Sequence, residues 1–148
     1  MTNIDKLGSD RTKYRAWARD IKRIMSIYFE DIEIVFEQIE LKNREPEVNR
    51  KMKMQGFQYT WGQEEFDDVI LHFPQVKTTG WGIDPYDTAM KALWAVLEVK
   101  TSGGSSDIVE HLSNVADPTH KRNVFEAYRR IHKWYTELTG EALEMRRN

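Results

Sequence analysis

The sequence predicts an all-α fold: a compact bundle of about five to six helices, with a long irregular segment between the second and the central helix. Apolar residues recur at helical spacing over residues 11–28 and 123–138. The pairs Asp84-Pro85 and Asp117-Pro118 each combine an N-cap residue with proline at the first helical position. Between the two halves, residues 42–82 are repeatedly interrupted by glycine and proline, which break regular patterns.

The first helix is predicted to run from about Arg11 to Tyr28, with Ser9 or Asp10 as its cap. Its apolar residues take steps of three and four, which places them on one face of a helix. The expected buried stripe is Tyr14, Trp17, Ile21, Ile24 and Tyr28.

A second helix is predicted from Glu30 to about Leu41 as the antiparallel neighbour of the first. Glutamates occupy the face opposite its apolar residues. The expected buried stripe is Ile32, Val35, Phe36 and Ile39.

The irregular segment, residues 42–82, contains the candidate interaction surface. Loops longer than about 12–15 residues are uncommon in compact domains and often functional, so the segment is either a packed excursion or a binding surface. A basic cluster precedes three aromatic residues that alternate with polar ones, a pattern of a short strand or hairpin. The candidate surface comprises Arg50, Lys51, Lys53, Phe57, Tyr59 and Trp61. A short helix is predicted over 64–73, with Phe66, Val69, Ile70 and Phe73 as its apolar residues.

Asp84-Pro85 predicts the start of a helix that ends at Gly103-Gly104. This helix is apolar nearly all round, which predicts that it is the central and most buried one. Ser105 or Ser106 is expected to cap a short helix that follows.

The last helix is predicted to begin at Asp117-Pro118 and to stop at Thr139-Gly140. Its core stripe is expected to be Val124, Tyr128, Ile131, Tyr135 and Leu138, whereas Arg129, Arg130, Lys133 and Glu137 fall outside the stripe.

With 148 residues, the chain fits one domain with a single core, expected over residues 1–140. Residues 141–148 are expected to be a tail or the start of a linker to a C-terminal domain. No apolar run reaches the roughly 20 residues of a membrane span, and the first residues lack a signal-peptide layout. We therefore expect a cytosolic or nuclear protein with no membrane partner.

The residue inventory favours a protein that is not an enzyme and that uses no cofactor. The chain has no cysteine, which excludes disulfides, thiolate nucleophiles and Cys-rich zinc sites. No glycine-rich phosphate loop is present, and the histidines lack metal-site spacing; they are His72, His111, His120 and His132. The acidic residues of 64–68 could offer oxygen ligands to a divalent cation, but such clusters usually serve solubility.

Charge is distributed unevenly along the chain. Residues 61–119 are predominantly acidic, and the residues from His120 onward carry an excess of lysine and arginine. These two parts of the surface could attract each other within one molecule or between molecules.

Hydrophobic motifs in three regions resemble the Gag capsid region of LTR retrotransposons, especially the copia-type and related Gag families. The resemblance covers roughly residues 9–40 and 89–138. It is carried by Tyr14, Trp17, Ile21, Leu93, Leu97, Ile108, Val109, Phe125, Ala127, Tyr128, Ile131 and Tyr135. The family usually has tryptophan at the position of Tyr128, and its counterpart of residues 42–82 is commonly shorter.

The resemblance implies a non-enzymatic capsid N-terminal domain that self-assembles into a shell around RNA, as part of a polyprotein or as a domesticated descendant. Its main partner would be a second copy of itself, bound either through this domain alone or with the help of a C-terminal domain. Direct RNA binding through Arg50, Lys51 and Lys53 beside the aromatic residues is a weaker expectation, because the sequence pI is 6.1. The alternative hypothesis is a monomeric helical module that binds another protein through residues 42–82.

Overall fold

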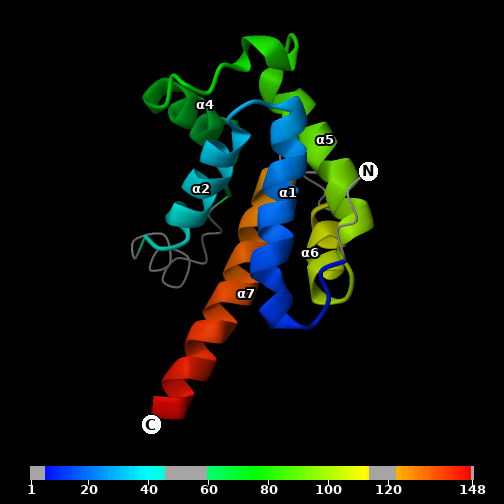
Figure 1. Ribbon diagram of the computed structural model, residues 1–148, viewed down its shortest axis with the longest axis vertical. Helices are drawn as coiled ribbons and strands as arrows, with labels where there is room; N and C mark the ends of the chain where they lie inside the picture. Colours follow the sequence, from blue (N-terminus) through cyan, green and yellow to red (C-terminus); the bar gives the residue numbers. More distant parts are fainter. Residues whose placement is uncertain (1–5, 46–59, 114–122, 148) are drawn as a thin grey trace.

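The computed structural model describes residues 6–45, 60–113 and 123–147, with the side chains of the last range described up to residue 136. Within these residues the chain forms six α-helices and two short 3-10 helices. Extended pairing in this part of the chain is limited to an isolated bridge between Leu7 and Thr101. The predicted all-α bundle is therefore confirmed (Figure 1).

The first two helices form an antiparallel pair, as predicted. The 3-10 helix η1 (Arg11–Lys13) leads into α1 (Tyr14–Tyr28), and α2 (Ile32–Lys42) returns beside it (Figure 1). The Asp10 carboxylate caps η1 by accepting a hydrogen bond of 3.0 Å from the Thr12 amide. All four residues of the predicted α2 stripe are fully buried.

The predicted stripe of α1 is correct only for its first part. Tyr14, Trp17 and Ile21 are buried, but Ile24 is half-buried and Tyr28 is 73% exposed. Because α1 ends at Tyr28, the chain turns there and the next residue, Phe29, enters the core instead. Met25 is the last buried residue of the helix itself.

The irregular segment contains two helical elements in its described part. The predicted short helix is confirmed as α4 (Gln63–His72), in which Phe66 and Val69 are buried. The 3-10 helix η2 (Thr78–Trp81) follows and buries Trp81. Thr60 to Gly62 form no strand, and the remainder of the predicted strand or hairpin lies outside the described residues.

Helix α5 (Pro85–Lys100) begins where predicted, because Asp84 caps it through the Asp87 amide and Pro85 occupies the first turn. It is not the most buried helix, however. Only its residues Tyr86, Ala89, Leu93 and Leu97 are buried. The prediction failed because alanine and valine are tolerated on a solvent-facing side, so an apolar composition alone does not require burial on every side.

Helix α6 (Gly104–Ser113) starts one residue before the predicted serine cap. Gly103 has φ of +58°, a left-handed conformation that glycine adopts without a Cβ clash, so the turn lies there. Ser105 is therefore inside the helix. Its hydroxyl is buried and donates 2.7 Å to the Leu7 carbonyl, which ties the N-terminal segment to the start of α6.

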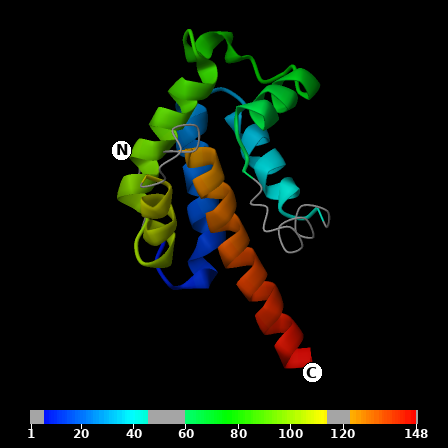
Figure 2. The same ribbon diagram turned by 180° about the vertical axis from the view of Figure 1, so that it is seen from behind.

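The central helix is α7 (Val124–Arg147), which packs against α2, α5 and α6. Figures 1 and 2 show it running through the bundle and extending past it at the C-terminal end. The predicted stop at Thr139-Gly140 is wrong, since the helix runs to Arg147. Glycine costs only about 1 kcal/mol within a helix, and the glutamates, leucines and alanine around Gly140 are strong helix formers. The predicted start, Asp117-Pro118, lies outside the described residues.

Aromatic rings join the helices around α7. The Phe36 ring meets the Tyr128 ring edge-on, with 4.8 Å between centroids, and Tyr14 stacks on Tyr135 at 5.3 Å. At the other end of the core, Phe66 contacts Phe125 at 6.0 Å. These contacts join α1, α2, α4 and α7 in one core.

Candidate functional site

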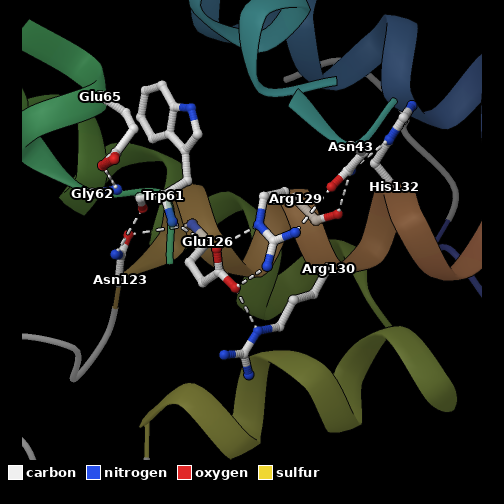
Figure 3. A network of polar contacts seen from close by, with 9 residues as sticks. All are labelled: Asn43, Trp61, Gly62, Glu65, Asn123, Glu126, Arg129, Arg130 and His132. Carbon is white, nitrogen blue, oxygen red and sulfur yellow. Dashed lines mark hydrogen bonds and ion pairs between the residues drawn. The ribbon is translucent and has the colours of Figure 1, made fainter. Parts of the chain in front are cut away.

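A buried ion pair lies near the start of α7 (Figure 3). The Glu126 side chain is 0% exposed and that of Arg129 is 2% exposed. Arg129 donates to both Glu126 oxygens, from Nε to Oε1 and from Nη2 to Oε2, each at 2.7 Å. Arg130 adds a third bond, from its Nε to Oε2 at 2.7 Å. The prediction that Arg129 lies outside the core stripe is wrong, because this pairing allows its charge to be buried.

The same carboxylate holds the segment around Trp61. The Trp61 amide donates 2.9 Å to Glu126 Oε1, and Asn123 Nδ2 donates 2.9 Å to the Trp61 carbonyl. Asn123 Oδ1 in turn accepts from the Glu126 amide at 3.2 Å. Both backbone groups of Trp61 are thus bonded to residues at the start of α7, which places its ring against Phe125 with 5.4 Å between centroids.

Asn43, just beyond α2, extends the network to His132. Its Oδ1 accepts from Arg129 Nη1 at 3.0 Å, so its Nδ2 is the donor to the Arg129 carbonyl at 3.0 Å. The Nδ2 group also lies 2.9 Å from His132 Nδ1. With the amide in this orientation, Nδ1 is an acceptor and the imidazole is neutral. Figure 3 shows these contacts leading from Trp61 through Glu126 and Arg129 to His132.

This arrangement is a cross-link between three segments of the chain. Glu126 accepts hydrogen bonds from Trp61, Arg129 and Arg130 and is fully buried. A carboxylate held in this way is not positioned to take a proton from a substrate, because general acid–base chemistry needs a group within reach of the reacting atoms. The network therefore positions α2, α7 and the residues around Trp61 relative to one another.

His132 is expected to make the free energy of unfolding dependent on pH. Burial lowers the pKa of its imidazole below the usual 6.5; the Glu40 carboxylate opposes this, whereas Arg44 and Lys22 lower the pKa further. The folded state therefore binds fewer protons at this group than the unfolded state as pH falls below about 6.5. We expect the contribution of His132 to stability to be present above this pH and to decline below it. Protonation would also put an N–H opposite the Asn43 amide donor.

The measurement is urea unfolding between pH 5 and pH 7.5, an interval around the ordinary histidine pKa of about 6.5. His132→Gln should make the free energy of unfolding depend less on pH in this interval. His111→Gln, at an exposed position, should retain it. An unchanged profile in the His132 variant would show that another group causes the dependence.

The predicted interaction surface is only partly within the described residues. Trp61 is 2% exposed and packs in the core, so its assignment to an exposed contact surface is wrong. At Trp61, burial agrees with the alternative in which the irregular segment is a packed excursion. Arg50, Lys51, Lys53, Phe57 and Tyr59 lie outside the described residues. Of the other histidines, His72 and His111 are exposed and His120 lies outside this part of the chain.

Two open grooves flank α2. One, with a volume of about 880 Å³, lies between α1, α2 and α7, and its rim includes Arg11, Arg15, Arg19 and Arg23. The other, of about 580 Å³, lies between α2 and α4 and is lined by Glu64, Asp67 and Asp68. The four arginines repeat at intervals of four residues, which places them on one side of a helix. This spacing is visible in the sequence, but the helix was predicted from its apolar residues and the arginines were not identified as a surface.

Within the described residues, no three His, Asp or Glu side chains gather closely enough to hold a metal ion. No helix in this part of the chain is long and apolar enough to cross a bilayer. No family model matches the sequence, and no curated protein or solved structure matches it either.

Proposed function

We propose that this chain is a structural, self-associating domain of the Gag capsid type, whose copies contribute to a shell around RNA. One structural observation supports self-association. Large apolar side chains are exposed together at the end of the bundle where α1 ends and α5 begins: Ile27 is 71% exposed, Tyr28 73% and Ile83 fully exposed. The resemblance to Gag capsid domains supports the shell and the RNA.

These side chains belong to one end of the molecule. Phe29 follows Tyr28 and meets the ring of Trp81, two residues before Ile83, with 5.2 Å between centroids. Figure 1 shows the end of α1 beside the start of α5. A single exposed apolar residue is ordinary, but a group of them marks a contact surface. We call Ile27, Tyr28 and Ile83 the apolar end.

A second copy of the chain is the occupant that a capsid-type domain requires for this surface. Burying one isoleucine-sized side chain stabilises an association by about 1.5–3 kcal/mol. Each copy offers the same surface, so a pairwise contact through the apolar end would be isologous.

We expect Ile83→Ser to weaken self-association by about a hundredfold or more, because an isologous contact loses the side chain from both copies, about 3 kcal/mol in total, and 1.4 kcal/mol is a factor of ten in affinity. Its melting temperature should stay close to that of the unmodified chain, because the Ile83 side chain is already in water. Light scattering coupled to size-exclusion chromatography over a range of concentrations measures the effect. Val99→Ser, at a half-exposed position on α5, is the matched control and should associate normally.

Two results would contradict this proposal at different levels. If Ile83→Ser associates as well as the Val99 control, the apolar end is not the contact. If the unmodified chain is monomeric at every concentration and salt, self-association by this chain is wrong, and the alternative of a monomeric interaction module is favoured.

A further inference from the structure

An arginine ladder lines one side of the groove between α1, α2 and α7. Arg11, Arg15, Arg19 and Arg23 are all exposed, and each follows the last by four residues, a rise of about 6 Å along a helix. Like charges at this spacing repel one another and destabilise a helix. A helix that retains such a ladder gains no stability from it unless carboxylates face it.

Three glutamates of α2, Glu33, Glu37 and Glu40, line the same groove, but within the described residues Glu33 and Glu37 form no ion pair. Arg19 pairs with Asp20 of its own helix, at 3.6 Å, with the Arg19 side chain largely exposed and that of Asp20 half-buried. Glu40, across the groove, is already engaged by Lys22 Nζ at 2.7 Å. Within the described residues, Arg11, Arg15 and Arg23 form no ion pair. These three guanidinium groups are therefore not held in ion pairs in this part of the chain and can pair with a partner's carboxylates.

A second set of carboxylates lies in the groove on the other side of α2. Glu64, Asp67 and Asp68 are exposed on α4, and Glu64 and Asp68 have the same four-residue spacing as the arginines. Among the described residues that line this groove, Lys42 carries the positive charge, and its Nζ lies 3.2 Å from Glu45 Oε2. His72 lies 3.3 Å from Asp68 and adds positive charge only when protonated. We call Glu64, Asp67 and Asp68 the acidic face.

Apolar contact accompanies the charge at the acidic face. Leu41 and Leu71 both line this groove, and they are 49% and 76% exposed. Charges at the rim of a contact determine register and encounter rate, whereas apolar residues that become buried provide most of the affinity. The acidic face thus combines both features of a contact surface.

We propose that the arginine ladder of one copy docks on the acidic face of the next copy. This inference rests on the proposed self-association and specifies one of its contacts. Figures 1 and 2 show α2 between α1 and α4, so the two surfaces lie on opposite sides of α2 and do not meet within one molecule. A contact between two different surfaces is heterologous, and it generates rings when it closes and filaments when it does not.

Charge reversal on each surface tests the contact with full-length chains. The ladder variant carries Arg15→Glu and Arg23→Glu, and the acidic-face variant carries Glu64→Lys and Asp68→Lys. Each alone should weaken self-association by on the order of tenfold or more at low salt, because attraction is replaced by repulsion. Lys77→Glu, at an exposed position outside both surfaces, should leave self-association unchanged.

Mixing the two variants is the decisive measurement. The reversed ladder of one variant then faces the reversed acidic face of the other, so their charges are again opposite. The unmodified acidic face of the first variant likewise matches the unmodified ladder of the second. The equimolar mixture should therefore regain the mass seen for the unmodified chain. Raising the salt from 0.05 to 0.5 M should weaken the contact in the unmodified chain, because screening shortens the range of charge interactions. Helix content and melting temperature of both variants should stay near those of the Lys77 control.

The outcomes separate this inference from the proposed function. Two results would show that the ladder does not dock on the acidic face: both variants associate as well as the unmodified chain, or the mixture fails to regain mass while both variants remain folded. In either case self-association through the apolar end still stands. If the unmodified chain never associates, both proposals are wrong.

Discussion

Replacing Glu126 by glutamine is expected to lower the free energy of unfolding by about 3–5 kcal/mol, because it leaves the buried Arg129 charge without its carboxylate. This is a large fraction of the roughly 5–15 kcal/mol that stabilises an ordinary domain. The shape of the side chain is nearly unchanged, so a loss of this size would come from charge and hydrogen bonding and not from packing. Glu30→Gln, at an exposed position between α1 and α2, should change stability by less than about 0.5 kcal/mol.

A double-mutant cycle separates the ion pair from its surroundings. Arg129→Met should also be strongly destabilising, since it leaves the Glu126 carboxylate buried with one guanidinium fewer and removes the contact to Asn43 Oδ1. The double variant combines Glu126→Gln with Arg129→Met. Its loss in free energy of unfolding should be smaller than the sum of the two single losses, by about 0.5–3 kcal/mol. Urea unfolding of the four proteins provides the comparison. Additive losses would show that the two charges do not depend on each other.

The sequence was most informative where structure is determined locally. The Asp10 cap, the Asp84-Pro85 start of α5 and the apolar stripe of α2 depend on residues within a turn or two of one another, and all are present. Helical spacing reports which residues share a face, but not how far that face continues into the core. Thus Tyr28, on the predicted stripe of α1, is exposed because the helix ends there.

The buried network was missed because its partners are distant in sequence. Arg129 bonds Asn43 across 86 residues, and the Trp61 amide reaches Glu126 across 65. A charged residue on a helix is normally assigned to the solvent side, since burying it unpaired is very costly. The one local signal was that Glu126, Arg129 and Arg130 stand at helical ion-pair spacing. That spacing is common on exposed faces, so it does not by itself predict burial.

The Trp61 side chain connects this network to the apolar core. It is 2% exposed, and both its backbone amide and its carbonyl are held by residues at the start of α7. A tryptophan in an irregular segment is usually suspected of binding, because tryptophan is favoured at interfaces. Its burial against Phe125 gives it the role of a core residue here.

Trp61→Ala should therefore destabilise the chain about as much as Tyr128→Ala, at a fully buried position on α7. Truncating a buried aromatic residue typically costs about 3–5 kcal/mol, which lowers the melting temperature of a domain of this size by roughly 6–20 °C. Trp134→Ala is the matched control: its side chain is 50% exposed, so we expect a clearly smaller loss. Melting followed by circular dichroism compares the three variants. If Trp61→Ala melts like the Trp134 control while self-association weakens, Trp61 is a contact residue after all; a melting temperature lowered as far as in Tyr128→Ala places it in the core.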